Sequence, residues 1–120
     1  MTQLSKNFHE SEFLCSCCGG GAGRMDPYLI TLLQQVRDGF GFPMKVTSGY
    51  RCPKHNKAVG GSDNSDHMQG KAVDILCVEG GRRREIVYLA LTVGIRSIGV
   101  KRDCVHLAMS EPARIFTYDV

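Results

Sequence analysis

The sequence has no long apolar segment. None of its apolar runs reaches the roughly 18 residues that a membrane-spanning helix needs, so we expect no membrane span. The opening MTQLSKNFHESEF lacks the basic start, the apolar stretch and the small-residue cleavage site of a secretory signal peptide. We therefore expect the protein to be cytoplasmic as synthesised.

A strong charge of one sign is also missing. The formal net charge is only +3, and Lys and Arg are dispersed apart from Arg82–Arg84, so the sequence gives little support for nucleic-acid binding. A composition of 42% hydrophobic and 22% charged residues is typical of a globular chain and not of a disordered one. With 120 residues and no internal repeat, we expect residues 1–120 to form one domain with a modest core, and a monomer.

Two helices are predicted from the spacing of apolar residues. The pair Asp26–Pro27 favours a helix start, because a carboxylate caps free backbone amides and proline suits the first helical position. This helix should end at Gly39 or Gly41. A second helix is predicted over 82–93, closed by Gly94. The apolar stripe of the first helix consists of Leu29, Leu32, Leu33, Val36 and Phe40.

Strands are predicted at 44–48, 71–77, 95–100 and 104–109, with a short final one at 115–118. The segments 95–100 and 104–109 are separated by three residues only, which predicts a tight hairpin. Strands joined by hairpins, with two helices placed apart, indicate the α+β class with a small, mainly antiparallel sheet.

The stretch SDHMQGKAVD, residues 65–74, contains a candidate metal site. The predicted strand carries Asp74 among apolar residues and leaves His67 at the mouth of the preceding loop. A buried carboxylate needs a cationic partner, because desolvating it alone is very costly. Two histidines, His67 and the strand residue His106, together with Asp74 would form a three-ligand site with an open position, as is common for catalytic zinc. The alternative is a surface His67 and an Asp74 that pairs with lysine or arginine.

The motif S-x-H-x-x-G-x-A-x-D, followed by a later strand histidine, resembles the zinc D-alanyl-D-alanine carboxypeptidase family of metallopeptidases. That group includes D,D-dipeptidases and phage L-alanyl-D-glutamate endolysins, and shares its fold with Hedgehog signalling domains. The resemblance extends to EFLCSCCGGG before DPYL, then to TSGYRCPKHN, VGGSDNSDH, SIGV and VHL. It covers nearly the whole chain and implies a Hedgehog/DD-peptidase-like fold.

The resemblance also implies roles for single residues. Asp103, three residues before the last histidine, matches the catalytic base, where many relatives have glutamate. Arg51 matches the arginine that meets the substrate and stabilises the oxyanion. Ser65 is not part of this match: we expect it to cap its turn, with contact to substrate as a second role. One departure is Ala108, because relatives often carry an acidic residue there. The implied zinc ligands are His67, Asp74 and His106.

By this resemblance the protein is a Zn²⁺-dependent peptidase that hydrolyses amide bonds in peptidoglycan stem peptides. D-Ala-D-Ala carboxypeptidase activity is the first expectation. An L-Ala-D-Glu endopeptidase, acting as a phage or prophage lysin after holin-type release, is the second. The third is a non-catalytic, zinc-containing binding module, and the orientation of Asp103 towards the metal would discriminate it from an enzyme.

Six cysteines are many for this length. In a reducing cytoplasm they should be thiols or metal ligands and not disulfides. Structural zinc motifs usually contain two separated C-x-x-C pairs, and this chain does not contain two. The sequence leaves open whether Cys15, Cys17, Cys18 and Cys52 bind a second metal or form a disulfide.

Overall fold

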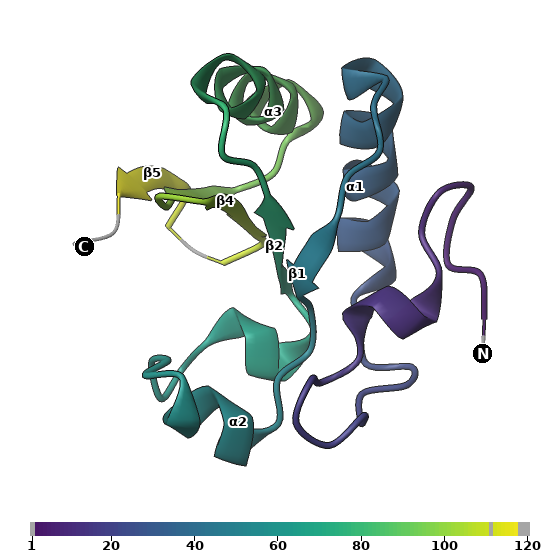
Figure 1. Cartoon of the computed structure of the whole chain (residues 1–120), viewed down its shortest axis with the longest axis vertical. Coiled ribbons are helices and arrows are strands. Elements are labelled where there is room, and N and C mark those ends of the chain that lie inside the picture. The colour runs from purple at the N-terminus through teal and green to yellow at the C-terminus, as the bar shows by residue number, and fades with distance from the viewer. Residues whose placement is uncertain (1, 111, 118–120) are drawn as a thin grey trace.

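A computed structural model describes residues 2–110 and 112–117 of the chain. It contains a five-stranded, mostly antiparallel sheet and two long helices (Figure 1). The predicted α+β class is therefore confirmed. Among the described residues, no helix is both long enough and apolar enough to cross a membrane.

The two long helices are α1, Pro27–Phe40, and α3, Gly80–Val93. The carboxylate of Asp26 accepts a hydrogen bond from the Tyr28 amide, as the Asp-Pro start predicts. Helix α3 begins two residues before its predicted start, because the Glu79 carboxylate caps it through the amides of Gly81 and Arg82. Both helices end at a glycine with a left-handed backbone, at positions Gly41 and Gly94.

Three short helices lie outside this pair. A 3₁₀ turn, η1, spans Glu10–Phe13 in the N-terminal segment. Helix α2 spans Pro53–Ala58, and a second 3₁₀ turn, η2, spans Asp66–Gln69. His67 therefore lies on a short turn and not in an open loop.

The sheet has the strand order β1-β2-β4-β3-β5. Its strands are β1, Val46–Ser48; β2, Ala72–Leu76; β3, Ser97–Val100; β4, Cys104–Ala108; and β5, Arg114–Thr117. Among the strands of the described residues, only the β3–β5 pair is parallel. Ser97 pairs with both Ala108 and Arg114, so the chain leaves β4 and enters β5 at the same end of the sheet. Tyr118, the last residue of the predicted final strand, lies outside the described residues.

The two faces of the sheet have different surroundings. Because side chains alternate along a strand, Val73 and Ile75 of β2 point to the face opposite to that of Asp74. Val105 and Leu107 of β4 join them in the hydrophobic core, which also contains the buried residues of α1 and α3. One face of the sheet is thus packed on the helices, and the other is left for polar side chains.

Candidate metal centre

Asp74 and His106 are direct neighbours on adjacent strands. They form a register pair between the antiparallel strands β2 and β4, so their side chains project from the same face at short range. Nδ1 of His106 lies 2.9 Å from Oδ1 of Asp74. Their side chains are 11% and 5% exposed, so the pair is held away from bulk water.

The turn η2 carries His67 over this pair. Ser65 starts the turn by accepting a hydrogen bond from the His67 amide at 3.2 Å. Gly70 ends the turn with a φ of +70°, and a Cβ at that position would collide with the carbonyl oxygen of Arg24. A glycine is required there, because other residues rarely adopt this backbone and a side chain would have no space.

The imidazole of His67 has one nitrogen with a partner and one without. Nδ1 lies 2.8 Å from the carbonyl oxygen of Gly49, and since a carbonyl only accepts, Nδ1 carries the proton. In the neutral ring, Nε2 therefore presents a lone pair. This atom is buried, has no hydrogen-bond partner, and lies 3.5 Å from Oδ2 of Asp74.

This arrangement fits a bound zinc ion. One ligand atom from each of His67, Asp74 and His106 lies within 4.8 Å of the others. Two imidazole nitrogens and one carboxylate form a donor set that zinc enzymes use, with a fourth position left for water or substrate. A buried nitrogen without a partner is costly, and a cation at this point would satisfy the Nε2 of His67.

Two cationic side chains flank the carboxylate. Nη2 of Arg51 and Nζ of Lys101 lie 3.4 and 3.6 Å from Oδ2 of Asp74. The guanidinium of Arg51 is itself fixed, because it donates to Oγ of Ser48 at 3.1 Å and to Oδ1 of Asn56 at 3.4 Å. Sequence reasoning did not single out Lys101; the available signal was a basic residue in the turn just before the strand of His106.

The surroundings keep Asp74 ionised. Burial by itself would raise the pKa of this carboxyl group, but the hydrogen bond from His106 and the charge of the two imidazoles when they are protonated hold its pKa well below the ordinary value. A permanent carboxylate is the form that binds a cation.

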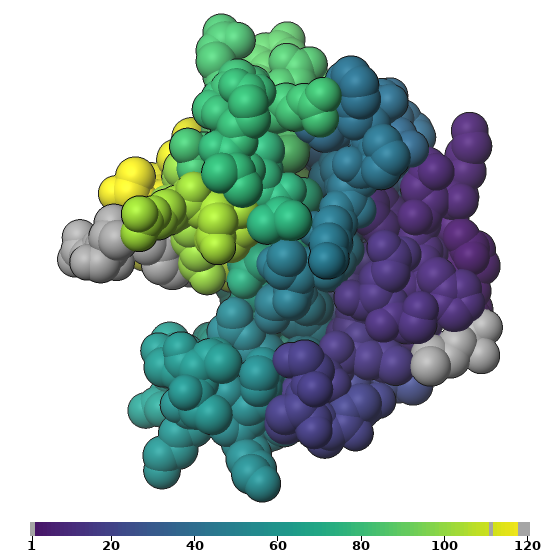
Figure 2. All heavy atoms as spheres, in the orientation of Figure 1, coloured from purple at the N-terminus to yellow at the C-terminus, as the bar shows by residue number. Residues whose placement is uncertain are grey.

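Two of the three residues, His67 and His106, border a large cavity. Its volume is about 930 Å³, and both His67 and His106 line it, as do Arg51 and Ser65. Figure 2 shows the hollow between the teal part of the surface, which carries α2 and η2, and the yellow-green part from the last strands. Basic residues on the cavity wall are Arg51, Lys71, Lys101 and Arg114.

Asp103 lies apart from the other residues expected at the site. It belongs to the turn before β4, its side chain is exposed, and its carbonyl oxygen accepts a hydrogen bond from the Cys77 amide at 2.8 Å. Within the described ranges 2–110 and 112–117, the residues lining the cavity do not include Asp103. The structure thus brings five of the six expected residues together: Arg51, Ser65, His67, Asp74 and His106.

Comparison with known protein families identifies the chain. A family model described as Peptidase M15 matches residues 6–108, a span that contains the whole His67, Asp74 and His106 group. The chain belongs to the peptidase M15 family. M15 peptidases are zinc-dependent, so this assignment supports a metallopeptidase that acts on peptidoglycan peptides. A search of curated proteins finds no match.

Proposed function

We propose that this M15 peptidase hydrolyses an amide bond of peptidoglycan stem peptides with a zinc ion held by His67, Asp74 and His106, and that it acts as a D-Ala-D-Ala carboxypeptidase. One observation carries the proposal. The buried Nε2 of His67 has no partner and faces Asp74 beside a cavity of about 930 Å³. A buried nitrogen lone pair beside a carboxylate, at the edge of a cavity, is the arrangement expected of a metal ligand next to a substrate site.

The roles of the chain's own residues follow from their chemistry. When bound, zinc supplies a Lewis acid that polarises a carbonyl group and lowers the pKa of water. The Asp103 carboxylate takes the proton of the attacking water and passes it to the leaving amide nitrogen. The structure has this side chain exposed and outside the cavity lining, so the role requires the turn before β4 to bring Asp103 to the cavity. Arg51 offers a planar fork of N–H donors to the oxyanion or to a substrate carboxylate.

The basic wall of the cavity supports an acidic substrate. Lys101 and Arg51 lie within 4 Å of Asp74, and Lys71 and Arg114 line the same cavity, so basic side chains surround the place where a substrate carboxylate would lie. A stem peptide ending in D-Ala-D-Ala carries its terminal carboxylate next to the scissile amide. An L-Ala-D-Glu linkage also carries a carboxylate next to its scissile amide. The two candidate substrates therefore share this negative charge and differ in the residues on either side of the bond.

The test uses defined peptides and zinc-loaded protein. A stem pentapeptide ending in D-Ala-D-Ala and a muropeptide containing L-Ala-D-Glu are incubated separately, and the products are identified by mass spectrometry with and without a chelator. Release of D-Ala, abolished by the chelator, is the expected result. Cleavage only after L-Ala would replace the carboxypeptidase by the endopeptidase. Binding without cleavage would indicate the non-catalytic module, and cleavage that resists the chelator would contradict the zinc mechanism.

A further inference from the structure

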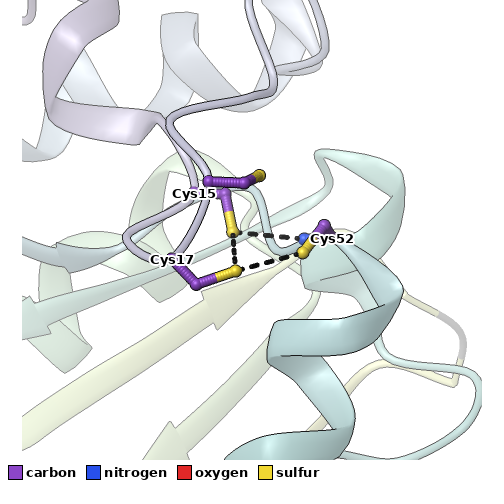
Figure 3. Close-up of side chains that lie close together, drawn as sticks. Cys15, Cys17 and Cys52 are labelled. Atoms are coloured by element: carbon purple, nitrogen blue, oxygen red, sulfur yellow. Dashed lines mark hydrogen bonds between the residues drawn. The ribbon is translucent and has the colours of Figure 1, made fainter.

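Four cysteines that play no part in the proposed reaction form a second cluster. Cys15, Cys17 and Cys18 come from the loop after η1, and Cys52 stands just before α2. One sulfur from each lies within 4.8 Å of the others. Figure 3 shows the side chains of Cys15, Cys17 and Cys52 converging from these two segments.

The spacing of the sulfur atoms suits a tetrahedral metal ion. Sγ of Cys17 lies 3.7 Å from Sγ of Cys15 and 3.4 Å from Sγ of Cys52. Four thiolates around zinc at bond lengths of ~2.3 Å lie ~3.8 Å from one another. A disulfide joins two sulfurs only, and would leave the other two thiols of the cluster without a role.

Backbone amides point at three of the sulfurs. The amide of Cys52 donates to Sγ of Cys15 at 3.4 Å, and that of His55 donates to Sγ of Cys52 at 3.3 Å. The amide of Gly20 donates to Sγ of Cys18 at 3.4 Å. Hydrogen bonds of this kind stabilise the thiolate form, which is the form that binds metals.

We propose that Cys15, Cys17, Cys18 and Cys52 bind a structural Zn²⁺ ion. Four protein ligands fill a tetrahedral site and leave no position for substrate. Among the residues that the structure describes, none of the four cysteines lines the cavity, so this ion is separate from the catalytic chemistry. The cluster supplies a single C-x-x-C pair, Cys15 to Cys18, and the chain fold brings Cys52 to it in place of a second pair.

The ion fastens the N-terminal loop to the segment that carries Arg51. The Tyr50 amide donates to the Phe13 carbonyl at 2.8 Å, and a Cβ at Gly49 would collide with the backbone of Phe13. The Arg51 amide donates to the His67 carbonyl at 3.1 Å. Zinc at Cys52 therefore holds the backbone next to Arg51, and through it the turn of His67.

The experiment counts metal ions in the full chain, purified under reducing conditions and supplied with zinc. We expect two zinc equivalents per chain by elemental mass spectrometry. Cys17→Ser and Cys18→Ser should each retain one equivalent, and His67→Ala should retain the other one. Cys77→Ser is the matched control, because Cys77 is a buried cysteine outside the cluster, and it should retain two.

Cobalt binding gives a second, spectroscopic measurement on the wild type and on two of these variants. Cobalt added to the metal-free wild type should produce thiolate-to-metal charge-transfer absorption in the near ultraviolet, retained in His67→Ala and lost in Cys17→Ser. Three results would overturn the proposal. The wild type could hold one metal ion and show no thiolate signal, or the cluster could hold iron instead of zinc. The reduced wild type could also form a disulfide in the presence of zinc, seen as a loss of two hydrogen masses.

Discussion

The two clusters of metal-ligating residues differ in how the chain builds them. The centre of His67, Asp74 and His106 rests on two paired strands and one turn, is buried, and opens on a cavity. The thiol cluster rests on a loop and a helix start, and Cys17 and Cys18 are exposed.

On the proposed roles, this difference would separate two uses of the same kind of ion. Three ligands on two paired strands and one turn would leave a free coordination position in a place where substrate can enter, which catalysis requires. Four cysteine ligands on a loop and a helix start would leave no such position, but they would close a loop of about 37 residues between Cys15 and Cys52, which would stabilise a fold with a small core. The following predictions test whether the two groups act separately.

The largest effect is expected for His67→Ala. This change removes the ligand atom Nε2 and should reduce kcat/KM by at least ~10²-fold, since losing even an outer partner of a metal ligand costs 10–100-fold. Stem-peptide hydrolysis at saturating zinc measures the effect. His9→Ala is the control, because His9 caps η1 and lies outside both groups. If His67→Ala keeps its activity, His67 is not a ligand of the catalytic metal, and the contrast between a catalytic and a structural centre is wrong.

Asp103→Asn should follow, with kcat lowered by ~10²–10⁴-fold, the range for loss of a general base. The substitution keeps the size of the side chain and removes its ability to accept a proton. The zinc content should stay at the wild-type value, because Asp103 is not one of the three grouped ligands. A pH–rate profile that keeps its acidic limb in Asp103→Asn would assign the base to another residue, and would fit the exposed position of this side chain.

Arg51→Lys should lower kcat/KM by about 10²-fold, near the cost of one oxyanion donor. Lysine retains the charge beside Asp74 but loses the planar fork that Ser48 and Asn56 hold in place. Zinc content and thermal stability are measured alongside. Arg24→Lys is the control, because Arg24 lies over the Tyr50 ring and does not line the cavity. Equal losses in both variants would mean that Arg51 acts only through the fold.

Local signals in the sequence predicted most of the fold. The cap at Asp26, the alternation around Asp74 and the glycine at 94 each depend on near neighbours, and the structure has all three features. The start of α3 was predicted too late, since the capping Glu79 is followed by two glycines that normally interrupt helices. The parallel pairing of β5 depends on which strand edge is free, and no local pattern contains that information.

The sequence predicted the cluster of His67, Asp74 and His106 better than it predicted the cysteine cluster. The spacing of His67 and Asp74 in one short motif, with a histidine in a later strand, is enough to suggest a centre. The position of Lys101 depends on how the β3–β4 turn folds back, and it was missed. The meeting of Cys52 with Cys15 depends on a long loop closure that a count of C-x-x-C pairs does not detect.

The smallest expected effect is a difference in the pH dependence of the metal-free protein. Hydrogen bonds outweigh burial and lower the pKa of Cys15 from 9.0 to about 6, so its thiolate stabilises the fold fully above pH 9 and loses this effect as pH falls through 6. The imidazoles outweigh burial at Asp74 and lower its pKa, so its contribution is complete above pH ~4 and is lost only in stronger acid.

Urea unfolding of the reduced, chelator-treated chain between pH 6 and pH 9 should therefore show stability that rises with pH. Cys15→Ser should flatten this rise, whereas Asp74→Asn should leave it intact, because Asp74 is ionised throughout the range. Cys77→Ser controls for the loss of a buried thiol whose pKa burial raises and which stays protonated at neutral pH. Asp74→Asn could instead flatten the increase of stability with pH as much as Cys15→Ser does. The thiol cluster and the centre of Asp74 would then be coupled through Arg51 and His67, and the division into a catalytic and a structural centre would be wrong.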